Sequence, residues 1–167
     1  EKCIMQDKKP DVIIVDYADL IRGHGQEKRH ELEGIYEDLR GMAGEYEIPV
    51  WTASQANRSA LEEDVIDASK VSESYGKVMV ADFVLSLSRK IQDKLAGTGR
   101  WHVIKNRFGP DGITLPSKMN LSNGQFNIYT DTSLQGQNTQ KQMDKGDELA
   151  KQLLARKYKE TQNTGFE

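Results

Sequence analysis

Asp16 stands at the end of a run of apolar residues, where a carboxylate can take part in chemistry. The run, residues 11–17, has four consecutive β-branched residues between two aspartates. An acid at the carboxyl end of a buried parallel strand lies where α/β sheets bind ligands. Carboxylate oxygens suit Mg²⁺, a hard cation that often keeps water ligands. Asp16 is therefore a candidate magnesium ligand, unless it only caps a loop. Asp19 is expected to cap a turn.

A second candidate, Gln55, follows the next apolar run, Ile-Pro-Val-Trp-Thr-Ala-Ser at residues 48–54. A neutral amide at a strand end can hydrogen-bond a phosphate oxygen or a positioned water. Because the amide carries no charge, it can also release that partner after a reaction. Gln55 is therefore a candidate phosphate sensor. The alternative is an amide that caps the following loop.

Lys105 and Arg107 form a basic pair directly before a run of turn residues, Phe-Gly-Pro-Asp-Gly at 108–112. Residues two apart on a strand share a face. A guanidinium is always charged and presents a planar fork to phosphate oxygens. The pair is therefore a candidate for binding phosphate, and the alternative is a solvated basic strand face.

These residues need elements that bring them together. Residues 11–17 do not alternate between apolar and polar, which indicates a strand covered on both faces, as in a parallel α/β sheet. A helix is predicted over about 26–47, where apolar residues recur at the spacing of a helix lying on a sheet. Pro49 marks its end, and residues 48–54 predict a second buried strand. Strand, helix and strand form a βαβ unit with parallel strands.

Further elements are predicted later in the chain. A short helix is predicted near Glu73–Val80, and the alternating segment 81–89 predicts a strand nearer the sheet edge. Residues 101–107 and 112–121 flank the turn residues and predict a hairpin. A second turn at residues 123–124, Asn-Gly, precedes another strand.

The composition changes near residue 132, so we predict a domain over 1–130 and a tail over 131–167. Residues 134–146 are polar and predict a linker. Residues 147–160 have leucines and a tyrosine at helical spacing, which predicts a short amphipathic helix. This helix either lies on the surface with little to pack against or docks a partner protein.

The bulk composition limits the function. The 167-residue chain has a net charge of −3 and a pI of about 5.7, whereas a domain that coats nucleic acid is usually basic. Contact with nucleic acid is therefore expected through a few loops only. The single cysteine, Cys3, excludes an internal disulfide and suits a reducing compartment. No apolar run approaches the ~18 residues of a membrane span.

In order and spacing, residues 10–130 resemble the C-terminal ATPase domain of DnaB-like hexameric replicative helicases. Residues 54–58, Ser-Gln-Ala-Asn-Arg, resemble the family's SQLNR segment, and the strand ending in Asp16-Tyr17 resembles its IDY strand. Residues 105–112 resemble its KxRNGPxG hairpin, with Phe108 in place of the usual asparagine. The resemblance implies an α/β fold: part of a RecA-like P-loop NTPase core, with a parallel sheet, helices on both faces and C-terminal β-hairpins.

The resemblance also implies roles for the candidate residues, with ATP and Mg²⁺ as cofactors. Asp16 is similar to the Walker B aspartate, which holds the magnesium of ATP, here through water. Gln55 would sense the nucleotide. The family's hairpin points across the subunit boundary to the neighbour's ATP. Arg107 therefore resembles an arginine finger acting in trans, and Lys105 would add a second positive charge.

In the family, two loops face the central channel of the ring and hold the phosphates of single-stranded DNA. Residues of this chain in the matching regions are Glu73, Ser74, Gly76, Lys77 and Arg29. Lys77 could replace the charge of an arginine where this chain has Ser72. The alternative for residues 73–77 is a plain structural loop. The alternative for Arg29 is a solvated helix start.

The function implied is ATP-dependent unwinding of duplex DNA at the replication fork, by a homo-hexameric ring that moves 5′-to-3′ on single-stranded DNA. Expected partners are a primase and a helicase loader, with no membrane, in the cytoplasm of a bacterium or a phage-infected host. Two alternatives stay open. One is another RecA-type ATPase, similar to RadA or KaiC, and the other is a non-catalytic ring subunit or adaptor that acts as an interaction scaffold.

The 167 residues contain no G-x-x-x-x-G-K-[ST] motif, whose backbone amides and lysine would cradle the β- and γ-phosphates. We expect that motif, and the family's catalytic glutamate, to precede residue 1. The chain by itself is therefore expected to bind Mg-ATP weakly or not at all. Titration calorimetry checks this, and tight binding would contradict it.

Overall fold

The structure is a computed structural model that describes residues 8–22, 28–60, 63–71, 75–130 and 132–163. The chain forms two compact units. Unit 1 comprises Glu1–Ala60, Asp67–Val84 and Ile104–Asp111. Unit 2 comprises Leu61–Ile66, Leu85–Val103 and Gly112–Glu167. Asp16, Gln55, Lys105 and Arg107 all belong to unit 1.

Unit 1 is built on a parallel strand pair. Strands β1 (Ile13–Val15) and β2 (Val50–Thr52) pair in parallel, and helix α2 (Lys28–Tyr46) lies between them in the chain. In the register, Ile13 pairs with Val50 and Val15 with Thr52. The predicted βαβ unit is confirmed, although each paired strand is only three residues long.

Helix α2 packs its apolar stripe against one face of this strand pair. Its buried residues Leu32, Ile35 and Tyr36 cluster with Ala18, and Val15 of β1 packs against the cluster. Within the described chain the other face is open, because Ile14 is 75% exposed and Trp51 is 52% exposed. The predicted cover on both faces is therefore not found among the described residues. Trp51 meets the ring of Phe83 edge-on, with ring centroids 6.2 Å apart.

Short helices complete unit 1. Three 3₁₀ helices are η1 (Ala18–Leu20), η2 (Arg58–Ala60) and η3 (Ala68–Lys70). Helix α3 (Gly76–Val80) packs against α2 and confirms the short helix predicted near residues 73–80.

A four-stranded sheet follows, in the order β3-β4-β5-β6. Its strands are β3 (Phe83–Ser88), β4 (Thr98–Asn106), β5 (Thr114–Asn120) and β6 (Gln125–Ile128). Strands β3 and β4 contribute residues to both units. The predicted hairpin and the second turn are confirmed, since β5 pairs antiparallel with both β4 and β6. Gly124 has φ +69°, the left-handed conformation that glycine adopts without a steric penalty.

Helix α4 (Ile91–Ala96) was not predicted from the sequence. It is only six residues long, and its apolar residues Ile91 and Leu95 are exposed, so it has no inward apolar stripe to detect. It ends at Gly97, whose φ of +66° is a common helix-ending conformation.

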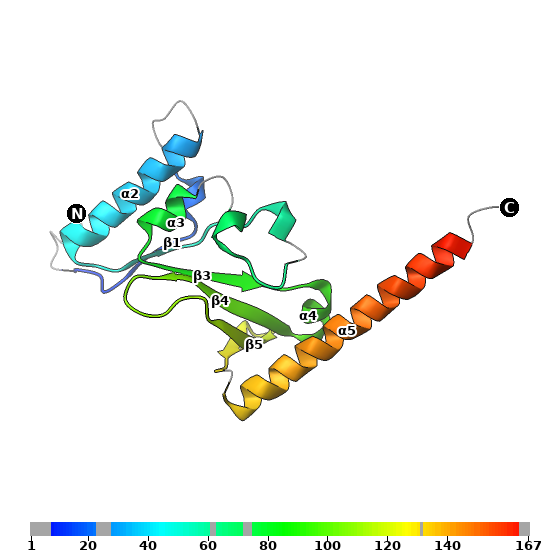
Figure 1. The fold of residues 1–167 in the computed structure, drawn as a ribbon. Coiled ribbons are helices and arrows are strands. Elements are labelled where there is room, and N and C mark those ends of the chain that lie inside the picture. Colours follow the sequence, from blue (N-terminus) through cyan, green and yellow to red (C-terminus); the bar gives the residue numbers. More distant parts are fainter. Residues whose placement is uncertain (1–7, 23–27, 61–62, 72–74, 131, 164–167) are drawn as a thin grey trace. The chain divides into compact units, whose positions relative to one another are not determined.

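The predicted polar linker is wrong. Residues 134–146 form the first half of helix α5 (Leu134–Asn163), which is 30 residues long. This half packs against α4 and β5 (Figure 1), and its buried positions are Gly136, Thr139 and Met143. A Cβ at residue 136 would lie 1.9 Å from the carbonyl oxygen of Thr130, so only glycine permits this approach. Small and polar residues thus form the stripe that packs, while residues 151–159 are exposed.

A buried charge cluster joins three elements of unit 2. Arg100 of β4 is 5% exposed and pairs with Asp93 of α4 at 2.5 Å and with Asp147 of α5 at 2.9 Å. Asp93 also accepts hydrogen bonds from the Thr98 hydroxyl and the Lys90 backbone. Buried charges are tolerated when they are paired and hydrogen-bonded in this way.

Arg100→Ala is expected to destabilise unit 2 by roughly 3–5 kcal/mol, because it leaves a buried carboxylate without its partner. Chemical denaturation followed by circular dichroism measures this loss. The matched control is Arg156→Ala, which removes an exposed arginine of α5. Equal stability of the two variants would contradict a structural role for the cluster.

Candidate functional site

The carboxyl ends of β1 and β2 lie side by side, and hydrogen bonds lock them together. The Thr52 hydroxyl donates to the carbonyl oxygen of Val15 at 3.0 Å and accepts from the backbone N–H of Ala18 at 2.9 Å. The chain leaving β1 is therefore fixed to the last residue of β2. Asp16 and Gln55 follow these two strand ends on one edge of the pair.

Asp16 and Gln55 are both exposed at this edge. Among the described residues no side chain hydrogen-bonds or ion-pairs with the Asp16 carboxylate, so its oxygens are available to a cation. Gln55 donates from Nε2 to the Tyr17 hydroxyl at 3.0 Å. The structure thus brings the Gln55 amide beside the residue that follows Asp16.

Asp19 was expected to cap a turn, and that interpretation is wrong. It lies in η1, and its carboxylate accepts three hydrogen bonds from other elements. The donors are the Tyr36 hydroxyl at 2.9 Å, the Ser54 hydroxyl at 3.0 Å and the Lys77 ammonium at 2.8 Å. Asp19 is therefore the centre of a polar network that joins η1, α2, α3 and the end of β2.

The network shifts the pKa values of its members. Burial by itself raises the pKa of Asp19, but the hydrogen bonds from Lys77, Tyr36 and Ser54 outweigh it and hold that pKa below its ordinary value. Burial, followed by the hydrogen bond to the Asp19 carboxylate, raises the pKa of Tyr36. Asp19 therefore stays ionised, and Tyr36 stays a neutral donor.

Lys77 was predicted to contact DNA, and its position does not suit that role. Its side chain is 2% exposed, and its ammonium pairs with Asp19 and lies 3.2 Å from the Ser54 hydroxyl. The ammonium also lies 5.5 Å from the centre of the Tyr36 ring, a cation–π distance. Because its charge is neutralised inside unit 1, Lys77 offers no phosphate contact and leaves the set of DNA candidates.

Lys105 and Arg107 both point to the connection between α3 and β3. Lys105 donates to the backbone carbonyls of Val78 and Met79 at 2.9 and 2.8 Å. Burial, followed by the nearby charge of Arg107, lowers the pKa of Lys105. Lys105 is thus held by the end of α3, where a cation also complements the helix dipole.

Arg107 is held more loosely. Its guanidinium pairs with Asp82 at 3.0 Å, and its side chain remains 45% exposed. Arg40 pairs with the same carboxylate oxygen at 2.9 Å. An exposed pair of this kind stabilises a fold by only ~0–1 kcal/mol, so Arg107 can leave Asp82 for another anion.

The remaining DNA candidates are only partly described. Glu73 and Ser74 lie outside the described residues. Arg29 lies in α2, but its side chain is also outside the described part. Gly76 is the first residue of α3, directly before the buried Lys77.

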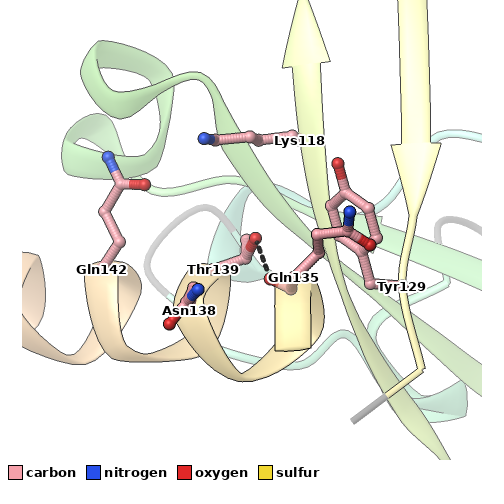
Figure 2. A pocket seen from close by; sticks show the side chains of 6 residues that line it. All are labelled: Lys118, Tyr129, Gln135, Asn138, Thr139 and Gln142. Atoms are coloured by element: carbon pink, nitrogen blue, oxygen red, sulfur yellow. Dashed lines mark hydrogen bonds between the residues drawn. The ribbon is translucent and has the colours of Figure 1, made fainter. Parts of the chain in front are cut away.

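Among the described residues, no group of three or more His, Cys, Asp or Glu side chains could hold a metal ion, and no helix could cross a membrane. A hollow of about 170 Å³ in unit 2 is lined by residues of β5, of α5 and after β6, including Lys118, Tyr129 and Gln142 (Figure 2). Three of its six lining residues are amides, and the dashed Thr139–Gln135 hydrogen bond is internal to α5.

Sequence reasoning missed the Asp19–Lys77 pair, although two signals pointed to it. Tyr36 lies on the apolar stripe of α2, and a buried tyrosine hydroxyl usually finds a polar partner. Lys77 directly precedes the apolar residues 78–80 of a short helix, where one side must face the core. Neither signal names its partner, because Asp19 and Lys77 are 58 residues apart.

A family model, the DnaB-like helicase C-terminal domain, matches residues 1–123. The chain belongs to this family. It is similar to the DnaB-like replicative helicase of Enterobacteria phage T4, with 31% identity over 105 residues, 60% of this chain and 22% of that protein. It is also similar to a probable plasmid replicative DNA helicase of Chlamydia muridarum (strain MoPn / Nigg), with 30% identity over 98 residues, 53% of this chain and 20% of that protein. The chain thus spans about a fifth of the length of these DnaB-like relatives.

Solved structures confirm the predicted RecA-like fold. One of them, described as an ATPase domain, superposes with a TM-score of 0.67 and 22% identity, over 77% of this chain and 49% of that one. A DnaB-like replicative helicase, described with its interactions with primase, gives a TM-score of 0.61 and 22% identity, over 71% of this chain and 31% of that one. At these identities the likeness concerns the fold of the DnaB-like domain alone.

The Asp19 network is expected to make the free energy of unfolding fall as the pH is lowered into the acid range. Because the pKa of Asp19 is lowered by folding, its contribution is present above the ordinary carboxyl pKa of ~3.9 and is lost as pH falls through the folded value. Asp19→Asn should lower the free energy of unfolding near neutral pH, and the gap to the wild type should narrow towards pH ~3.

Urea unfolding between these pH values checks this expectation. The control is Asp16→Asn, which removes an exposed carboxylate and should change stability by no more than ~0.5 kcal/mol. A wild-type to Asp19→Asn gap that stays constant with pH would mean that the ionised carboxylate does not hold the network.

Proposed function

We propose that this chain is part of a ring-shaped replicative helicase, which couples ATP hydrolysis to movement on single-stranded DNA and unwinds duplex DNA at the replication fork. One observation carries the proposal: a carboxylate without a partner among the described residues and an amide stand at the adjacent carboxyl ends of two parallel strands. In open α/β sheets this edge is where ligands bind. Membership of the DnaB-like family supports the same function.

Asp16 is the proposed magnesium ligand of this site. Its exposed oxygens fit a hard cation that keeps several waters and is otherwise held by the phosphates of its nucleotide. Mg-ATP, when bound, supplies the γ-phosphoryl group that is transferred to water. The role of Asp16 is to hold the cation through water, and the locked strand ends fix the direction of its carboxylate.

Gln55 is the proposed nucleotide sensor. Its Nε2 has one described acceptor, the Tyr17 hydroxyl, which a charged phosphate oxygen could replace. A charge-assisted hydrogen bond is roughly twice as strong as a neutral one, so the exchange would favour the bound state. Loss of the phosphate would return the amide to Tyr17.

Arg107 is the proposed arginine finger, acting on the ATP of a neighbouring subunit in a homo-hexamer. Its exposure and its weak surface pair support a side chain that can reach outward. Lys105 is proposed to add positive charge beside it, although its bonds to the α3 carbonyls also suit a residue that stiffens the hairpin base. A residue acting in trans requires head-to-tail packing of subunits, which closes into a ring.

Single-stranded DNA is proposed to contact the segment that contains Glu73, Ser74 and Gly76, together with Arg29. Backbone N–H groups and small residues can hold DNA phosphates without reading sequence. A primase and a helicase loader are the proposed protein partners, in the cytoplasm of a bacterium or a phage-infected host.

Arg107→Ala in the full-length protein is expected to reduce DNA-stimulated ATPase activity by ~10³–10⁵-fold, because the finger stabilises charge on the transferred phosphoryl group. Strand displacement on a forked substrate should be lost with it. Steady-state phosphate release, with and without single-stranded DNA, measures the effect.

Arg40→Ala is the matched control, since Arg40 pairs with the same Asp82 carboxylate but lies on α2. If disruption of the Asp82 pair alone caused the loss, both variants would show it. Unchanged turnover of Arg107→Ala would remove the finger assignment. Wild-type ATPase activity without strand displacement would favour another RecA-type ATPase over a helicase.

A further inference from the structure

Lys77 has a position that the proposed function does not use. It is the second residue of α3, and its side chain is 2% exposed. Its ammonium reaches the Asp19 carboxylate at 2.8 Å and the Ser54 hydroxyl at 3.2 Å. A buried ammonium with these partners is held in one place, because moving it away would leave two opposite charges unpaired inside unit 1.

The partners of Lys77 lie directly beside the residues of the proposed nucleotide site. Asp19 follows Asp16 by three residues, and the segment between them is fixed by the bond from the Ala18 N–H to Thr52. Ser54 immediately precedes Gln55. One ammonium therefore holds the segments that carry both the proposed magnesium ligand and the proposed sensor.

Lys77 also belongs to α3, so its ammonium links α3 to the segments that follow β1 and β2. Lys77 follows Gly76, the described residue of the segment proposed to contact DNA. The opposite end of α3 is anchored independently, because Lys105 bonds the Val78 and Met79 carbonyls and Arg40 bonds the Val80 carbonyl. Lys77 thus ties the beginning of α3 to the segments that follow the two strand ends.

We propose that Lys77, through its buried ion pair with Asp19 and its bond to Ser54, is a positioning residue that couples the nucleotide site to the DNA-contacting segment. The inference rests on the proposed function and adds a residue to it. A displacement of Ser54-Gln55 when the nucleotide changes moves Ser54, one of the two acceptors of the Lys77 ammonium, and α3 follows. Because coupling is reciprocal, DNA that holds the start of α3 also biases the strand ends.

The test compares variants of the full-length protein. Lys77→Met keeps an unbranched side chain, one atom shorter than that of lysine, and removes its charge. We expect DNA stimulation of ATPase activity, the ratio of kcat with and without oligodeoxythymidine, to fall by ~10-fold or more, within the range of allosteric couplings. Lys77→Arg keeps the charge and should retain most of the stimulation. Lys94→Met, an exposed lysine on α4, is the matched control and should keep the wild-type ratio.

Binding measurements separate coupling from simple loss of structure. In the wild type, the affinity for oligodeoxythymidine should differ between a non-hydrolysable ATP analogue and ADP, and in Lys77→Met this difference should shrink. A merely structural role would lower both affinities together and leave their ratio unchanged. If Lys77→Met does not fold, Ser54→Ala removes one of the two acceptors and should lower the stimulation ratio by a smaller factor.

The outcomes distinguish this inference from the proposed function. A folded Lys77→Met that keeps the wild-type stimulation ratio overturns the coupling while the helicase function stands. A Ser54→Ala variant with an unchanged ratio, where Lys77→Met is unfolded, does the same. A wild-type protein without any DNA-stimulated ATPase activity overturns both.

Discussion

The parallel pairing of β1 with β2 is the constraint on which the rest of unit 1 depends. Parallel strands place their carboxyl ends on one edge, so residues 34 positions apart or more in the chain become neighbours there. The Thr52 hydroxyl then fixes both strand ends, since it bonds the carbonyl of Val15 and the N–H of Ala18. With this geometry set, Asp16 leaves the strand pair from backbone that is held on both sides, at Val15 and at Ala18.

The residues of the site form two groups: residues that hold the strand ends and α3 together, and exposed residues that can bind a ligand. Asp19, Tyr36, Ser54 and Lys77 satisfy one another, and their buried charges make each contact costly to lose. Asp16 and Gln55 are exposed, with a single exchangeable hydrogen bond on Gln55 in the described chain. A site arranged in this way binds its ligand through the exposed pair without breaking the network beneath, which is the condition for precise positioning.

The elements formed by contiguous residues could be predicted from the sequence, whereas contacts between residues far apart in the chain could not. The βαβ unit and the two hairpin turns follow from apolar runs and turn residues that are contiguous in the chain. The Asp19–Lys77 pair joins residues 58 positions apart, and no local pattern carries that information. The first half of helix α5 was missed for another reason: two of its buried positions are Gly136 and Thr139, residues with low intrinsic helix preference. Tertiary contact with α4 and β5 overrides those preferences.

Lys105 and Arg107 show why two cations on one strand end need not share a role. Lys105 donates hydrogen bonds to two backbone carbonyls at the end of α3. A phosphate on another molecule could take their place only if those carbonyls lost their donor. Arg107 shares its acceptor, since Arg40 binds the same Asp82 oxygen and would keep that carboxylate paired if Arg107 left. The cost of releasing Arg107 is therefore small and the cost of releasing Lys105 is larger. In the proposed motor this asymmetry makes Arg107 the residue that reaches the neighbouring nucleotide and Lys105 the residue that holds the hairpin from which it reaches.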